Sequence, residues 1–231
     1  MTDIDHYAPS AIDFNPEEYQ LAKEMTQADI DKAVADFKAA AKRAAEAGFD
    51  GLELHAAHGY LIHEFLSPLS NERTDQYGGS LENRMRFLQE VLAAVKTVWP
   101  EERPIWIRVS ATDHAEGGLT GDDMVQIVNA VKDQIDVVHV STGGLITVPI
   151  HLYAGYQVSY AEQIKKECGI PVIAVGLINN FDLAQNLIED GRVDFVALGR
   201  ELLRNPYWCL THANERKRRD LIPTSYHRAY R

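Results

Sequence analysis

The sequence has little cysteine, no long apolar run and a deficit of positive charge. Two cysteines, Cys168 and Cys209, occur in 231 residues; they do not form a disulfide framework or a zinc motif, and we expect reduced thiols in a cytoplasmic protein. No apolar run reaches the roughly 18–20 residues of a membrane span, and residues 1–15 lack the basic and apolar regions of a signal peptide. Lys and Arg number 23 against 34 Asp and Glu, a net charge of −11, which disfavours nucleic-acid binding because that needs clustered positive charge.

The rest of the composition is that of an ordinary globular protein. Hydrophobic residues make up 45% of the chain and charged residues 25%, which excludes global disorder and low complexity. A chain of this length can bury about 70% of its unfolded surface, so its core needs no disulfide or metal. No Gly/Ser-rich linker divides it, and we expect a single domain over residues 1–231.

One pattern recurs along the chain: a charged helical stretch, an apolar run of about five residues, and a polar or Gly-rich loop. Short β-branched runs between helical patterns are typical of buried parallel strands in βα units. Because the crossovers of such units are right-handed and short, neighbours in sequence are expected to be neighbours in the sheet. The pattern predicts an α/β fold with helices outside and five sequentially ordered parallel strands at residues 50–55, 104–109, 136–141, 171–176 and 193–198.

The helices between these runs have recognisable ends. Thr26 and Asp29 have the spacing of a capping box before the first helix, and Gly48 is a plausible stop after it. Helices are expected at residues 28–46, 80–98, 120–132, 160–168, 180–189 and 206–218.

Five βα units preceded by one helix fit two architectures. A complete (β/α)₈ barrel needs eight strands and typically about 250 residues. Two architectures are therefore compatible with the sequence: an open doubly wound sheet, or a partial barrel that corresponds to the last five of the eight βα units. In either architecture the functional residues lie at the carboxyl ends of the strands.

Two imidazoles and a phenol come directly after the first predicted strand. His55, His58 and Tyr60 emerge together, and neutral imidazoles there can donate to a substrate oxygen or an anion. The alternatives are two ordinary core or surface histidines, or a zinc site, which needs a third ligand such as His63.

Arg108 lies within the second apolar run, where its side chain would face the interior of a barrel. A buried Arg is rare without an anionic partner. That partner is either Glu53, in an internal salt bridge, or an electron-rich ligand ring.

The last two strands end in glycine. Gly176 and Gly199 would let the backbone approach a phosphate closely, and Arg200 would add a charge-assisted contact. In a barrel, the loops after the last two strands form such a phosphate site. Plain turn glycines are the alternative.

A long motif resembles a known family. Residues 55–87 read HAAHGYLIHEFLSPLSNERTDQYGGSLENRMRF, which is similar to the old yellow enzyme family of FMN-dependent NAD(P)H oxidoreductases and ene reductases on a TIM barrel. Arg108, the turn at Gly176 and the run at residues 199–206 come in the family's order. The sequence is closest to the thermophilic-like branch of bacterial NADPH dehydrogenases.

The resemblance implies roles for individual residues. His55 and His58 match the pair that binds the carbonyl oxygen of an α,β-unsaturated substrate, and Tyr60 matches the tyrosine that protonates the α-carbon. The remaining implied assignments are Arg108 beside the flavin ring, Gly176, Leu177, Gly199 and Arg200 at the FMN phosphate, and Ala56, Ala57 and Arg228 in contacts with substrate or a neighbouring subunit.

The family's first three barrel strands have no counterpart in this sequence. It resembles the C-terminal two-thirds of the enzyme, and we expect a homo-oligomer or a complementing N-terminal segment. The implied cofactors are FMN and NADPH or NADH, the substrate is a small enone, and no nucleic acid or membrane partner is expected. A non-catalytic remnant or half of a split enzyme that binds flavin weakly is the alternative; a phosphate-binding aldolase is disfavoured, since no Lys lies at a strand end.

Overall fold

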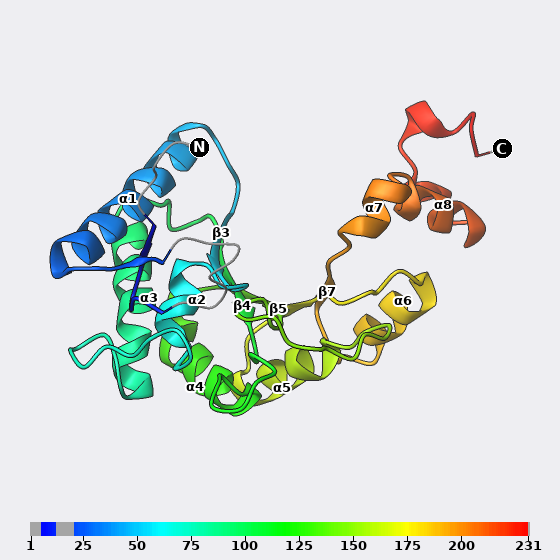
Figure 1. Cartoon of the computed structure of the whole chain (residues 1–231). Coiled ribbons are helices and arrows are strands. Elements are labelled where there is room, and N and C mark those ends of the chain that lie inside the picture. Colours follow the sequence, from blue (N-terminus) through cyan, green and yellow to red (C-terminus); the bar gives the residue numbers. More distant parts are fainter. Residues whose placement is uncertain (1–5, 13–20, 231) are drawn as a thin grey trace.

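The computed structural model describes residues 6–12 and 21–230. The expectation that residues 1–15 are not a signal peptide falls partly outside these ranges, at residues 1–5 and 13–15. The centre of the structure is a parallel sheet in the order β3-β4-β5-β6-β7 (Figure 1). The predicted strands and their order are confirmed, with the last two shorter than expected. The strands are β3 Leu52–Ala56, β4 Ile105–Ser110, β5 Val137–Ser141, β6 Val172–Ala174 and β7 Phe195–Val196.

Every helix predicted from the sequence is present. They are α1 Gln27–Glu46, α3 Leu81–Lys96, α4 Gly121–Val131, α5 Val158–Cys168, α6 Phe181–Glu189 and α8 Trp208–Glu215.

Several short elements were not predicted, because a turn or two of helix is too short to show a periodicity. These are α2 Leu61–Leu66, α7 Arg200–Arg204, the 3₁₀ turns Lys132–Gln134, Arg219–Leu221 and Thr224–Tyr226, and a small parallel pair, β1 Tyr7–Ala8 with β2 Lys23–Glu24.

The ends of α1 result from local chemistry. The Thr26 hydroxyl accepts a hydrogen bond from the Asp29 amide at 3.3 Å, and the Asp29 carboxylate accepts one from the Thr26 amide at 2.9 Å. These two bonds form the capping box that the sequence predicts. Beyond the last turn, Gly48 takes a positive φ of 83°, a conformation in which glycine has no steric penalty.

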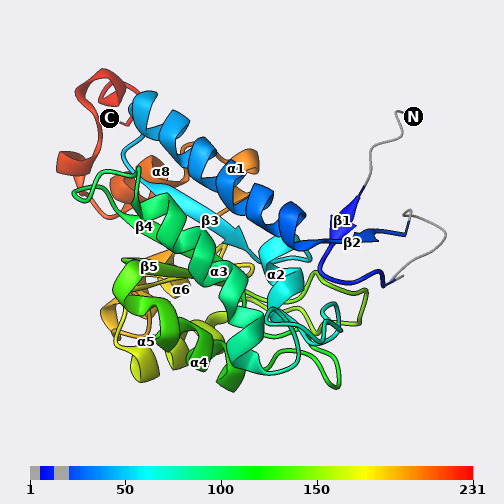
Figure 2. The ribbon, with the colours of Figure 1, turned by 90° about the vertical axis from the view of Figure 1, so that its left-hand side faces the viewer.

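The two faces of the sheet differ in burial, and this difference decides between the two architectures. Leu54, Ile107, Val138 and Val172 form one row across the sheet and are at most 4% exposed. The helices lie along the outer side of the curved sheet (Figures 1 and 2), and their cover accounts for the burial of this row. The opposite, concave face carries part-exposed residues, with Phe195 54% exposed. Helices on one face only are the arrangement of a barrel, not of a doubly wound sheet.

No helix in the described part of the chain is both long enough and apolar enough to cross a membrane. Cys168 is buried and Cys209 is exposed, and neither is in a disulfide. Burial raises the pKa of the Cys168 thiol above its usual value.

Candidate active site

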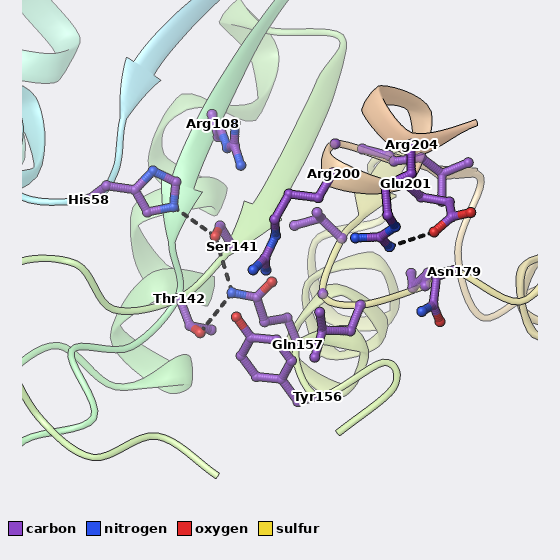
Figure 3. A pocket seen from close by; sticks show the side chains of 17 residues that line it. His58, Arg108, Ser141, Thr142, Tyr156, Gln157, Asn179, Arg200, Glu201 and Arg204 are labelled. Atoms are coloured by element: carbon purple, nitrogen blue, oxygen red, sulfur yellow. Dashed lines mark hydrogen bonds and ion pairs between the residues drawn. The ribbon is translucent and has the colours of Figure 1, made fainter. Parts of the chain in front are cut away.

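A cavity of about 380 Å³ opens at the carboxyl ends of β4 to β7 (Figure 3). It is the size of a small-molecule site. Polar residues and glycines line it, namely His58, Arg108, Ser141, Thr142, Tyr156, Gln157, Gly176, Asn179, Gly199, Arg200, Glu201 and Arg204, together with the apolar residues Val175, Leu177, Ile178, Ala197 and Leu198.

The three residues predicted at the end of the first strand lie together. The ring centroid of His55 is 5.2 Å from that of His58 and 4.9 Å from that of Tyr60. His58 lines the cavity, and His55 and Tyr60 stand beside it, Tyr60 being 62% exposed. The group can therefore present two imidazoles and a phenol to a molecule at the mouth of the cavity.

Both imidazoles are held neutral. Burial and the nearby charge of Arg108 lower the pKa of His58 to about 4 and also lower the pKa of His55. Near pH 7 each ring therefore carries one proton, and each has one nitrogen that donates and one that accepts.

Two serines from neighbouring strand ends hold His58. Its backbone amide donates to Ser110 Oγ at 3.0 Å, and its ring Nε2 lies 2.7 Å from Ser141 Oγ. Ser110 and Ser141 are paired in register at the ends of β4 and β5. His58 itself has a φ of +58°, so these contacts fix the imidazole on a backbone that few residues adopt.

The loop that carries His58 packs directly against the loop after β5. A Cβ at Gly144 would lie 2.8 Å from His58 Cα, and one at Gly59 would lie 2.7 Å from the Gly144 carbonyl oxygen. Both glycines also have positive φ. Side chains at these positions would push the two loops apart, so the glycines set the position of the imidazole.

Arg108 and Glu53 form no ion pair with each other in the described part of the chain. Glu53 Oε2 instead accepts from Trp106 Nε1 at 2.6 Å and lies 2.8 Å from His139 Nδ1. Burial would raise the pKa of Glu53, but these contacts and the charge of Arg108 outweigh it and lower the pKa. The buried Nε of Arg108 has no partner among the described residues, which leaves the guanidinium available to a ligand in the cavity.

The opposite end of the cavity combines glycines with guanidinium groups. Gly176 has a φ of +114° and Leu177 one of +53°, and no heavy atom lies within 4 Å of a Cβ built on Gly199. Arg200 and Arg204 both reach this end, and Arg204 is paired with Glu201 at 2.6 Å. Open backbone beside a guanidinium suits a phosphate group.

His63, the candidate third zinc ligand, has a different environment. It is fully buried, with Nε2 2.9 Å from Asp113 Oδ1, while its Nδ1 accepts from the Gly59 amide at 3.0 Å. Burial would raise the pKa of Asp113, but the contact with His63 and hydrogen bonds from Ser67 and the Leu119 amide lower it. No cluster of three metal-ligating residues exists in the described ranges, so the zinc alternative has no support.

The remaining predicted residues lie outside the cavity. Ala56 and Ala57 are fully buried behind the histidines. Arg228 is exposed in the C-terminal segment and does not line the cavity.

Several residues of the site were not assigned a role from the sequence. Ser110 and Ser141 carried a usable signal, because one directly follows a predicted strand and the other ends one. Tyr156 and Gln157 carried none, since they reach the cavity from a loop whose path no local pattern gives.

Comparison with known proteins gives a consistent result. The profile described as the NADH:flavin oxidoreductase / NADH oxidase family matches residues 3–219. NADPH dehydrogenases of Clostridium acetobutylicum and Geobacillus thermodenitrificans are 54% identical over 224 residues and 52% identical over 225 residues, covering 96% and 97% of this chain. The chain spans 66% and 65% of the lengths of these two relatives.

Solved structures agree with the sequence matches. Morphinone reductase aligns with a TM-score of 0.75 and 29% identity over 90% of this chain and 60% of its own. The complex of 2-naphthoyl-CoA reductase with 2-naphthoyl-CoA aligns with a TM-score of 0.82 and 29% identity over 88% of this chain and 32% of its own.

Proposed function

The chain belongs to the NADH:flavin oxidoreductase / NADH oxidase family, the old yellow enzyme family, and we propose that its site serves FMN-dependent reduction of activated alkenes by NAD(P)H. The substrate class is an α,β-unsaturated carbonyl compound. The observation that carries this proposal is the pair of neutral imidazoles beside a phenol, at the mouth of a cavity with guanidinium groups at both ends.

FMN is the cofactor that the family implies, and the donors of the cavity fit it. Gly176, Gly199 and Arg200 would hold the phosphate, because the open backbone of Gly199 and the Arg200 guanidinium both line this end of the cavity, next to the turn at Gly176. At the other end, the Nε of Arg108, which has no hydrogen-bond partner within the described ranges, suits the electron-rich end of the flavin ring. When bound, FMN supplies the hydride chemistry.

The residues of the chain would position and polarise the substrate. His55 and His58 donate to the carbonyl oxygen, where negative charge develops, and hydrogen bonds of this kind strengthen in the transition state. Tyr60 is the general acid that delivers a proton to the α-carbon. Arg108 stabilises negative charge at the ring by Coulomb attraction in a partly shielded site.

The described sheet ends in two unpaired edges, at β3 and β7, and we propose that a second chain completes the site. That partner is another copy of this chain, with Arg228 reaching the neighbouring site, or a complementing segment that supplies the rest of the barrel. The unpaired thiols fit a reducing, cytoplasmic location.

Turnover tests the proposal directly. The purified chain is supplied with FMN, NADPH and cyclohex-2-enone under argon, alone and with the segment of the Clostridium acetobutylicum relative that it does not match. We expect saturated ketone to form in at least one of the two mixtures. Tyr60→Phe should slow its formation by about 10²–10⁴, the usual contribution of a general acid.

The control is Tyr207→Phe, which alters an exposed tyrosine outside the cavity lining and should leave turnover unchanged. If FMN binds but neither mixture forms product, the chain is a non-catalytic flavin-binding protein.

A further inference from the structure

A chain of hydrogen bonds leads from His58 into the protein. Its Nε2 lies 2.7 Å from Ser141 Oγ. Gln157 Nε2 donates to that same oxygen at 3.1 Å and to Thr142 Oγ1 at 2.9 Å. Ser141, Thr142 and Gln157 are all buried, with exposed fractions of 4%, 6% and 3%, and Figure 3 shows the chain running along the wall of the cavity.

We propose that Ser141 and Gln157 are positioning residues that fix the proton of His58 on Nδ1, so that Nδ1–H is the donor offered to the substrate oxygen. The inference rests on the proposed function, because the tautomer of His58 matters only if this ring donates a hydrogen bond to the substrate carbonyl oxygen.

The donor-only amide nitrogen of Gln157 determines the direction of the hydrogen bond between Ser141 and His58. The amide nitrogen of Gln157 can only donate, so Ser141 Oγ is the acceptor in the bond from Gln157. No other acceptor for the Ser141 hydroxyl is present among the described residues, and its proton is therefore directed to His58 Nε2. An imidazole nitrogen that accepts a proton carries none of its own.

A neutral ring then has its proton on Nδ1. Burial and the charge of Arg108 keep the pKa of His58 at about 4, so the doubly protonated form is rare at neutral pH. The same ring is fixed in place through its backbone, where the His58 amide donates to Ser110 Oγ at 3.0 Å. The two serines thus have separate tasks: Ser110 holds the backbone, and Ser141 sets the tautomer.

The arrangement also links the two ends of the cavity. A Cβ at Gly176 would lie 2.9 Å from Gln157 Oε1, so Gln157 packs against the turn proposed to hold the phosphate. The residue that orients Ser141 is therefore itself positioned by the cofactor end of the site.

Nitrogen NMR measures the tautomer without any cofactor or turnover. Long-range ¹H–¹⁵N correlation of the full ¹⁵N-labelled chain at pH 7.5 distinguishes Nδ1–H from Nε2–H histidine, and the signals lost in His58→Asn give the assignment. We expect the wild-type ring to be Nδ1–H. A wild-type ring that is mainly Nε2–H would overturn the proposal before any variant is made.

Three variants show whether Ser141 is the cause. Ser141→Ala removes the donor to Nε2, so the Nε2–H form should become the major one, and Ser141→Thr, which keeps a hydroxyl, should restore the wild-type pattern. Ser225→Ala is the matched control: Ser225 is an exposed serine that does not line the cavity, so its loss should leave the tautomer unchanged. An unaltered tautomer in Ser141→Ala would contradict the role of Ser141.

Binding of 4-hydroxybenzaldehyde separates this inference from the proposed function. If the wild-type chain does not bind this phenol even with FMN and the complementing segment, the proposed function fails, while the tautomer measurement still decides the role of Ser141. If it binds, Ser141→Ala should weaken binding at least about tenfold, and the control Ser225→Ala should not. Equal binding by Ser141→Ala and wild type would show that the tautomer does not serve the ligand.

Discussion

Single side chains at the strand ends determine which ligands the cavity can hold. His58 has a backbone conformation that few residues adopt; Ser110 holds its backbone amide and Ser141 holds its ring. Among the residues that the structure describes, Arg108 has no ion-pair partner, because Glu53 is engaged by Trp106 and His139. The structure thus supplies neutral donors at the mouth of the cavity and positive charge within it.

The first prediction concerns the imidazole pair. His55→Ala should weaken binding of a phenolic ligand by about 2–4 kcal/mol, the cost of removing one donor to an oxyanion, as measured by the charge-transfer absorbance of the flavin-loaded protein. His151→Ala is the control, since His151 is an exposed histidine that does not line the cavity. Unchanged phenol affinity in His55→Ala would show that the pair is merely structural.

At the scale of residues, the sequence identified side chains that lie at the end of a strand. His55, Arg108, Gly176 and Arg200 could be chosen because an apolar run ends at or beside each of them. Gln157 could not, since its position depends on how residues 142–157 fold back over the sheet. Short-range patterns do not encode such a path.

At the scale of elements, α2 carries a half-buried acid, Glu64, that the proposed chemistry does not use. Burial raises the pKa of Glu64 to about 7, and no ion pair to its carboxylate is present in the described residues. Because α2 begins at Leu61, directly after Tyr60, the stability of this helix bears on the site itself.

The second prediction is the pH dependence that Glu64 causes. The unfolded chain loses this proton near the ordinary Glu pKa and the folded chain only at a pKa of about 7, so the free energy of unfolding falls as pH rises between these values. Glu64→Gln removes this loss. It should stabilise the protein at pH 8 relative to pH 4 by up to about 3 kcal/mol, measured by urea denaturation at both values.

The exposed Glu102 provides the comparison, and Glu102→Gln should shift stability equally at the two pH values. A Glu64→Gln variant with the same relative stability at pH 4 and pH 8 would contradict the raised pKa.

Elements were predictable where a pattern was long enough. The 20 residues of α1 show both a capping box and an apolar face, whereas α2 and α7, with six and five residues, are shorter than two turns. The strands β6 and β7 are shorter than their apolar runs because a strand extends only as far as its neighbour pairs with it. Side-chain patterns cannot show where that pairing stops.

At the scale of the whole molecule, the sheet has two open edges. Within the described residues, β3 pairs only with β4 and β7 only with β6, and the concave face between them exposes apolar surface such as Phe195. Unpaired edges and exposed apolar patches favour association.

The third prediction concerns the consequence of these edges. The purified chain should be oligomeric or poorly soluble on its own, as judged by sedimentation velocity at micromolar concentration. A monodisperse monomer under those conditions would show that the edges are protected within the chain.

The same openness limits flavin binding. The proposed phosphate contacts lie within this chain, but one side of the flavin ring would remain exposed to solvent. Burial of apolar surface contributes roughly 25 cal/mol per Å² to binding, and the exposed side would not supply this free energy. We therefore expect FMN to bind this chain more weakly than it binds a full-length relative, and inorganic phosphate or sulfate to compete with it near Arg200.

The most direct test of a flavin site in this chain is a fluorescence titration of the purified protein with FMN and, in parallel, with riboflavin, which lacks the phosphate. We predict saturable binding of FMN and at least about tenfold weaker binding of riboflavin, because a charged hydrogen bond contributes about 1.5–3 kcal/mol; Arg200→Ala should remove most of that difference. Equal affinity for the two flavins, or no binding of FMN at any attainable concentration, would contradict a flavin site built on these residues.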